Sequence, residues 1–185
     1  MIYAGKFKVT SPFGWRVRKG QNENHKGIDV VGLENKYICA VVPGTVGSST
    51  IITDKANTTW EWGNYVRIDG DDGRKYFYCH MSQRLVSVGQ RVKVGDLLGV
   101  EGNTGKSDGS HCHFEVRENG TSINPAPFLG VNNAVGVYTK TTLEDDLNIL
   151  VKHGVINTPG YWRNNAPKLE YLTELIHNMA EVLRK

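Results

Sequence analysis

Histidine and aspartate side chains are the groups of this sequence best able to carry out chemistry. The stretch GSHCHFEV contains His111 and His113 one residue apart, HKGID contains His25 and Asp29 four residues apart, and KYFYCHM contains His80. Imidazole and carboxylate groups bind metal ions or transfer protons near neutral pH. The spacing of the two closest histidines alone fits metal ligands, catalytic groups or polar residues on the wet face of a strand.

The stretch GSHCHFEV has the pattern of a β-strand, in which side chains two residues apart point the same way. One face is then polar and rich in imidazole: His111, His113, Glu115 and Arg117. The other face is apolar: Cys112, Phe114 and Val116. We therefore predict that Cys112 is a buried small hydrophobe and not a metal ligand. Glu115 either orients a ligand histidine or is a surface carboxylate paired with Arg117 or a lysine.

The same alternation applies to KYFYCHM. It predicts that His80 lies on the side of Tyr76 and Tyr78, and that Cys79 points the other way, toward a core. HxxxD and HxH are weak signals when taken singly, because chance produces them often. Four of the six histidines occur in these settings beside glycine-rich turns, so a functional cluster is the stronger interpretation.

Zinc is the metal that this combination of side chains suits. Two imidazoles and one carboxylate form a ligand set that zinc accepts, and about three protein ligands leave one position for a water whose pKa falls to about 7. The sequence contains no helical HExxH motif, so the general base would have to be a histidine outside the ligand set. Two histidines remain for that role, but residue types alone do not say which are ligands.

The elements that position these residues are predicted to be strands within residues 1–130. The 21 glycines separate short runs of aromatic and β-branched residues, a pattern typical of short strands and tight turns. In VSVGQRVKVGDLLGV, a β-hairpin is predicted by four valines at period two on either side of Gly-Gln and Gly-Asp turns: Val86, Val88, Val92 and Val94.

The pattern becomes helical after a predicted linker at residues 131–136. Residues 137–185 are predicted to form a helical hairpin. The apolar face of its first helix, with Thr142 as N-cap and Gly154 as C-cap, is Leu143, Leu147, Leu150 and Val151. The face of the second is Leu169, Leu172, Ile176, Met179, Ala180 and Leu183. A unit this small is marginal alone, so we expect it to pack on a partner, a second copy or the main domain.

The bulk composition excludes several classes of protein. The net charge of +3 and the pI of about 8.7 are too weak to indicate nucleic-acid binding, although a mildly basic body suits an anionic polymer. The three cysteines are odd in number and lack CxxC spacing, so no disulfide framework is expected. No apolar run approaches the roughly 20 residues of a membrane span, and no signal peptide is recognised at the start.

The motifs together resemble the LytM/lysostaphin-type zinc endopeptidases, which cut peptidoglycan peptides. The resemblance covers about residues 8–130, and the matching segments occur in the family's order: SPFGWR, HKGIDV, GNYVRIDGDDGRKYFYCHM, VGQRVKVGDLLGVEGNTGKSDGSHCHFEV and NPAPFL. It implies a mainly β fold, a small antiparallel β-sheet domain over residues 1–130 with the site in a groove on one sheet.

The resemblance also implies the roles of the five site residues. Position by position, His25, Asp29 and His113 bind one zinc ion, and His80 and His111 form the catalytic pair. One of the pair acts as general base, and both stabilise the tetrahedral intermediate. The family's usual leucine between the last two histidines is a cysteine here. Some relatives have lost ligands and serve as regulators, so the complete set favours an active enzyme with peptidoglycan as substrate.

Two other functions compete with the zinc peptidase. One is a non-catalytic wall-binding or phage tail component on the same fold, which the complete site argues against. The other is a lipoyl carrier, suggested by Lys55 in ITDKAN and by the hairpin-like VKVGDLLGVEG. In a carrier this hairpin should come before the lysine, whereas here it follows the lysine, which argues against the carrier. Trp60 and Trp62, in NTTWEWGN, either line a substrate groove or anchor their loop.

The expected place of action is the bacterial cell wall. Without a signal peptide, the protein is expected to be a holin-released phage lysin, a virion-associated lysin or a fragment of a longer protein. The peptidoglycan bond that is cut is not indicated by any motif.

Overall fold

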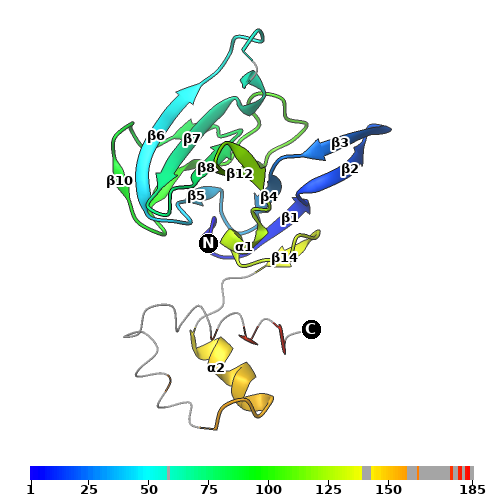
Figure 1. The fold of residues 1–185 in the computed structure, drawn as a ribbon, viewed down its shortest axis with the longest axis vertical. Coiled ribbons are helices and arrows are strands. Elements are labelled where there is room, and N and C mark those ends of the chain that lie inside the picture. The colour runs from blue at the N-terminus through cyan, green and yellow to red at the C-terminus, as the bar shows by residue number, and fades with distance from the viewer. Residues whose placement is uncertain are drawn as a thin grey trace. The chain divides into compact units, whose positions relative to one another are not determined.

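The computed structural model describes residues 1–57, 59–138 and 143–157, together with 162, 176, 179–180 and 182–183. The chain divides into two compact units, Met1–Thr139 and Lys140–Lys185. The first unit consists almost entirely of antiparallel strands (Figure 1), so the predicted mainly β class is confirmed. No described helix is long and apolar enough to cross a membrane.

The site is built on the largest sheet, in which every pairing is antiparallel. In spatial order its strands are β10 (Arg91–Val92), β6 (Gly44–Ile51), β7 (Asn64–Gly70), β8 (Lys75–Cys79), β12 (Cys112–Glu118), β4 (Ile28–Gly32), β1 (Phe7–Ser11) and β14 (Gly136–Tyr138). An additional strand, β13 (Thr121–Ile123), pairs with β12. The central position of β12, between β8 and β4, brings together segments that are far apart in the sequence.

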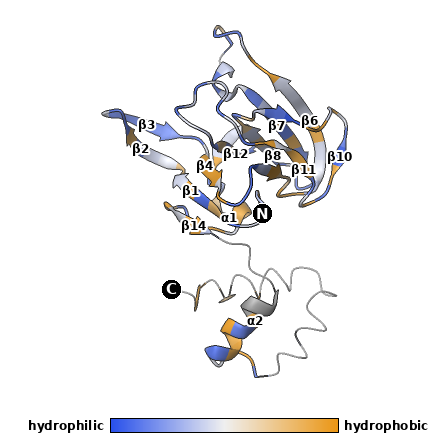
Figure 2. Cartoon of the chain, turned by 180° about the vertical axis from the view of Figure 1, so that it is seen from behind, coloured by the Kyte–Doolittle hydropathy of each residue, from blue (hydrophilic) through white to orange (hydrophobic). Residues whose placement is uncertain are grey.

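Two smaller sheets and two short helices complete the first unit. One sheet contains β5 (Tyr37–Cys39), β11 (Leu97–Val100) and β9 (Gln83–Arg84). The other is the hairpin of β2 (Gly14–Arg18) and β3 (Gln21–His25). The helices are η1 (Trp60–Trp62) and α1 (Ala126–Leu129). In Figure 2, β3 is hydrophilic and β4 is largely hydrophobic, as expected for a projecting hairpin and a central strand.

The main core lies on one face of the large sheet. Cys112, Phe114 and Val116 of β12 are fully buried there. Their alternation with His113 and Glu115 follows from the two-residue period of a strand. Burying each large apolar side chain stabilises the fold by about 1.5–3 kcal/mol. The prediction that Cys112 is a buried hydrophobe is confirmed.

The prediction that Cys79 points away from the tyrosines and into a core is confirmed, but the prediction that His80 lies on the side of Tyr76 and Tyr78 was wrong. Tyr76 and Tyr78 are fully buried in the main core, whereas Cys79 packs with Phe77 on the opposite face. His80 follows the end of β8 and has a φ of +64°, a left-handed conformation. Regular alternation would have sent His80 into the core with Tyr78, but this conformation interrupts the strand and redirects its side chain.

The predicted valine hairpin was also wrong. Both turns are present, with Gln90 N–H donating to Ser87 O and Asp96 N–H donating to Lys93 O. The strands that they connect do not pair with each other, since β10 pairs with β6 whereas β11 pairs with β5 and β9. Period-two valines predict strands but carry no information about the partner strand.

The boundary between the units lies later than predicted. Residues 136–138 are not the end of a linker and the start of a helical region, because β14 pairs with β1 and extends the large sheet. Tyr138 stacks on Phe7 with ring centroids 5.8 Å apart. The first unit therefore includes the chain up to Thr139 rather than ending at residue 130.

The second unit contains α2 (Leu143–Lys152). Gly154 follows it with a φ of +70°, and Val155 N–H donates to Leu150 O, so the predicted C-cap is confirmed. Four buried residues from both predicted helical segments form its core: Leu147, Leu150, Ile176 and Ala180. The predicted N-cap Thr142 and two residues of the second stripe, Leu169 and Leu172, lie outside the described residues.

Candidate metal centre

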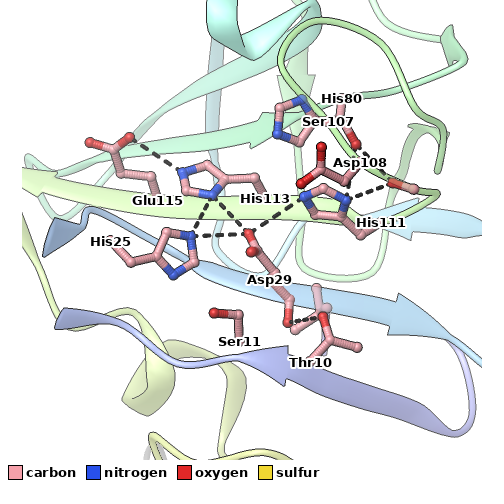
Figure 3. A network of polar contacts seen from close by, with 12 residues as sticks. Thr10, Ser11, His25, Asp29, His80, Ser107, Asp108, His111, His113 and Glu115 are labelled. Atoms are coloured by element: carbon pink, nitrogen blue, oxygen red, sulfur yellow. Dashed lines mark hydrogen bonds and ion pairs between the residues drawn. The ribbon is translucent and has the colours of Figure 1, made fainter. Parts of the chain in front are cut away.

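Three donor atoms converge on the exposed face of the large sheet (Figure 3). His25 Nε2 lies 3.0 Å from His113 Nδ1 and 3.1 Å from Asp29 Oδ1, and His113 Nδ1 lies 2.9 Å from that oxygen. The residues come from three strands: His25 ends β3, Asp29 lies in β4, and His113 lies opposite Asp29 in β12. Two imidazoles and a carboxylate at this spacing match the donor set of a zinc site, and His25, Asp29 and His113 are called the metal group below.

Gly27 explains why His25 and Asp29 can approach His113. A Cβ at this position would lie 2.5 Å from Phe114 O and 2.6 Å from the ring of His113. The backbone of the segment therefore passes directly against β12, which only glycine allows. Ile28 and Val30 then point into the core, so the alternation of β4 turns Asp29 to the opposite face.

Each histidine of this group is oriented through its other ring nitrogen. His25 Nδ1 lies 2.8 Å from Pro12 O, and as a donor to this carbonyl it leaves Nε2 with a free lone pair. His113 Nε2 lies 3.7 Å from Glu115 Oε2. Glu115 is almost fully buried, and Arg117 Nε donates to its other oxygen at 2.6 Å. Glu115 thus contacts both residues that the sequence offered as alternatives, and it is not on the surface.

The charged groups of this cluster shift one another's pKa values. Burial opposes the charged form of His113, but hydrogen bonds and charges from Asp29 and Glu115 outweigh it and raise the pKa of His113 to about 9. Burial also disfavours the charged form of Asp29, yet hydrogen bonds from His113 and His25 hold its pKa far below the usual range. The cluster therefore stabilises a positive charge in contact with Asp29, which is what a bound cation would supply.

His80 and His111 lie beside this group. Their ring centroids are 4.7 Å apart, and that of His80 is 5.9 Å from that of His113. His80 Nδ1 lies 2.8 Å from Thr104 O, and His111 Nδ1 lies 2.8 Å from Gly109 O. In a neutral ring, donation from Nδ1 to these carbonyls places the free lone pair on Nε2. His111 Nε2 lies 3.6 Å from Asp29 Oδ1.

His80 is held in its neutral form. Burial, and secondarily the nearby charges of His113 and His111, lower the pKa of His80 to about 3. Thr104 and Gly109, which orient His80 and His111 respectively, were not predicted from the sequence. They act through backbone carbonyls, so the type of their side chains offers no signal for this role.

A groove of about 750 Å³ opens over the five residues. The β2–β3 hairpin lines it with Arg16, Val17 and Arg18, and Trp62 of η1 lines it as well. Trp62 also packs on Tyr65 and Phe77, with ring centroids 5.1 and 4.8 Å away. Both roles considered for this tryptophan therefore occur together: it lines the groove and anchors its segment.

Comparison with known proteins gives one family. Residues 23–125 match the sequence model of Peptidase family M23, and this range includes all five histidine and aspartate positions. The chain is 36% identical over 106 residues to the peptidoglycan DD-endopeptidase ShyC of Vibrio cholerae, covering 57% of this chain and 23% of ShyC. It is 34% identical over 122 residues to the murein hydrolase activator NlpD of Escherichia coli, covering 66% of this chain and 29% of NlpD.

Solved structures with a similar fold belong to the same family. The catalytic domain of the prophage-encoded M23 protein EnpA from Enterococcus faecalis matches with a TM-score of 0.54 and 32% sequence identity. The match covers 64% of this chain and 88% of that domain. By contrast, the chain spans less than a third of the length of either curated relative. The similarity thus concerns one domain of those longer proteins.

Proposed function

The chain belongs to peptidase family M23, the LytM/lysostaphin type, and from this premise we propose that it is a zinc-dependent endopeptidase that hydrolyses peptide bonds of bacterial peptidoglycan. The observation that carries the proposal is the triangle of His25 Nε2, Asp29 Oδ1 and His113 Nδ1, with sides of 2.9–3.1 Å. The pairing of β12 with β4 and the close approach of β3 hold it in place before any metal binds.

His25, Asp29 and His113 are the residues proposed to hold one zinc ion. When bound, zinc supplies a Lewis acid that activates water and polarises the scissile carbonyl. Pro12 O and Glu115 orient the two ligand imidazoles. The groove of about 750 Å³ over them is the proposed place of the peptide substrate.

His80 and His111 are proposed to act on protons. In the neutral form each ring carries its lone pair on Nε2 because its Nδ1 is engaged by a carbonyl, and His111 Nε2 lies 3.6 Å from Asp29 Oδ1. One accepts the proton of the attacking water, and the imidazolium N–H formed in this way stabilises negative charge on the carbonyl oxygen and then donates the proton to the leaving amine. Burial keeps His80 neutral, as a proton acceptor must be before reaction.

The alternative function is that of a non-catalytic regulator or wall-binding component. The similarity to the murein hydrolase activator NlpD supports it. The complete set of five converging side chains favours the peptidase, because a binding module has no need of two base-competent histidines beside a donor triangle. Phage origin, a lytic role and action at the cell wall stay predictions, supported by the prophage-encoded relative EnpA.

Metal analysis combined with release of amino groups from purified peptidoglycan tests the proposal. The wild type should bind about one zinc per chain and release new amino termini. His113→Ala should lose the zinc, whereas His80→Ala should keep it and lose at least ~100-fold in kcat. A zinc-loaded wild type that releases no amino groups from several wall types would favour the regulator.

A further inference from the structure

A second cavity of about 470 Å³ adjoins the groove on the same face of the large sheet. It shares Thr59, Trp62 and Arg117 with the groove, so these three residues separate two neighbouring hollows. Its remaining lining residues are Tyr65, Arg67, Gly73, Lys75, Phe77, Asn119 and Gly120. The lining includes three cationic side chains, Arg67, Lys75 and Arg117, and no acidic residue. None of the lining residues is among the five residues proposed to bind zinc or transfer protons.

Strand register places the cations in line with the metal group. Lys75 pairs with Arg117 across β8 and β12, and Arg67 pairs with Phe77 across β7 and β8. Along β12, Arg117 is four residues from His113 on the same face, which corresponds to roughly 13 Å. A peptide that extends from the metal group over the sheet would reach the cations after about three or four residues.

Lys75 is the cation of this cavity that is free to bind a ligand. Arg67 Nε lies 2.8 Å from Asp69 Oδ1, and Arg117 Nε lies 2.6 Å from Glu115 Oε1, so both guanidinium groups are paired. Lys75 is exposed and has no ion pair among the described residues. Its acidic cross-strand neighbour Asp69 is the residue that pairs with Arg67.

The floor of the cavity is aromatic and rigid. Trp62 and Phe77 pack with centroids 4.8 Å apart, and the Arg117 guanidinium lies 5.2 and 5.0 Å from these two rings. Cation–π contacts and the ion pair with Glu115 hold Arg117 in one position. An apolar floor beside a free ammonium suits a ligand that carries an aliphatic segment and a carboxylate.

We propose that this cavity is a substrate subsite that binds a side carboxylate of the stem peptide, with Lys75 as the residue that selects it. The proposal rests on the proposed function, since a peptide cleaved in the groove reaches Lys75 by crossing Trp62 and Arg117, which line both hollows. The aliphatic part of the peptide lies on the half-buried Trp62, and the carboxylate accepts hydrogen bonds from the Lys75 ammonium.

Two cross-linked peptidoglycan peptides test this subsite, identical except that the side carboxyl groups of the stem are free in one and amidated in the other. We expect the wild type to cleave the free-acid peptide with about tenfold higher kcat/KM. Lys75→Gln should bring the ratio close to one, and Lys75→Glu should invert it. Lys93→Gln, which changes an exposed lysine outside both cavities, should keep the wild-type ratio.

Binding of the same two peptides to zinc-loaded His80→Ala, with and without Lys75→Gln, separates this inference from the proposed function. A preference for the acid that depends on Lys75 supports the subsite even if the wild type cleaves neither peptide, in which case only the proposed function fails. Equal binding of acid and amide, or a preference that survives Lys75→Gln, overturns the subsite whether or not cleavage occurs.

Discussion

Gly27 is the residue on which the convergence of the metal group depends most directly. Its hydrogen occupies the space between Phe114 O and the His113 ring, where a methyl group would approach within 2.6 Å of both. The two side chains of HKGID can contact β12 only because no Cβ separates the segments. The glycine of this motif therefore has a steric role as definite as the chemical roles proposed for its neighbours.

Gly27→Ala should displace His113 and weaken zinc binding at least tenfold, with a loss of about 2–3 kcal/mol in the free energy of unfolding. Competition with a chromogenic chelator measures the affinity, and denaturant unfolding measures the stability. Gly109→Ala is the matched control, because a Cβ there meets nothing within 4 Å. Unchanged zinc affinity in Gly27→Ala would show that the close approach is not required.

Glu101 is a buried carboxylate that ties the His111 segment to the rest of the fold. Its oxygens accept hydrogen bonds from Tyr3 Oη at 2.7 Å, Ser110 Oγ at 2.7 Å and Lys36 Nζ at 2.8 Å. Burial favours the neutral form, but these hydrogen bonds and that from a backbone N–H outweigh it and lower the pKa of Glu101. The ionised form thus stabilises the folded protein.

Glu101→Gln should destabilise the protein by about 2–3 kcal/mol at neutral pH, since it leaves buried donors facing an amide. A lowered folded-state pKa contributes stability above the unfolded pKa of about 4.3, and this contribution is lost as pH falls through the folded value. The difference in the free energy of unfolding between Glu101→Gln and the wild type should therefore shrink below about pH 4, as measured by denaturant titrations. Glu118→Gln, which changes an exposed carboxylate, should leave the free energy of unfolding close to that of the wild type. A loss of stability in Glu101→Gln that does not change with pH would refute the ionised state of Glu101.

At the scale of elements, β14 is the strand that decides where the first unit ends. It pairs with β1 from Phe7↔Tyr138 to Val9↔Gly136, and Tyr138 stacks on Phe7. On its other side β1 pairs with β4, the strand that carries Asp29. β14 therefore supports the metal group indirectly, through two successive strands.

A chain that ends after residue 139 should retain zinc binding and the stability of the first unit. A chain that ends after residue 130 should lose about 2 kcal/mol or more, because β1 becomes an exposed edge and the Phe7–Tyr138 stack disappears. Thermal unfolding of the two truncations, each with and without zinc, makes the comparison. Equal stability of the two chains would show that β14 is dispensable.

At the scale of the whole molecule, two compact units predict two responses to metal. All five proposed site residues belong to Met1–Thr139, whereas Lys140–Lys185 has its own buried cluster. Only the unit that binds the ligand in its folded state is stabilised by it. Zinc should therefore raise the melting temperature of the first unit and leave that of the second unit unchanged.

Chelation should lower the melting temperature of the first unit by roughly 5–10 °C. This corresponds to about 2.7 kcal/mol at a zinc concentration one hundred times Kd. Calorimetry of the wild type with and without chelator gives the shift, and His113→Ala, which lacks a proposed ligand, is the control that should not respond. A shift of equal size in that variant would mean that zinc stabilises the fold elsewhere.

Much of the site was predictable because it depends on local periodicity. The two-residue period of a strand separates His113 and Glu115 from Cys112 and Phe114 without reference to any partner, and the structure agrees. The helix cap at Gly154 is local in the same sense. These features depend on the conformation of a few consecutive residues, which the sequence encodes directly.

Only the tertiary structure determined which groups meet. His25 and His113 are 88 positions apart, and their nitrogens come within 3.0 Å because β12 inserts between β8 and β4. His80 reaches them through a left-handed backbone that no alternation rule predicts. Strand pairing and backbone reversal depend on hydrogen bonds between distant segments, whereas the chemical types of the side chains and the faces on which β12 presents them follow from the local sequence.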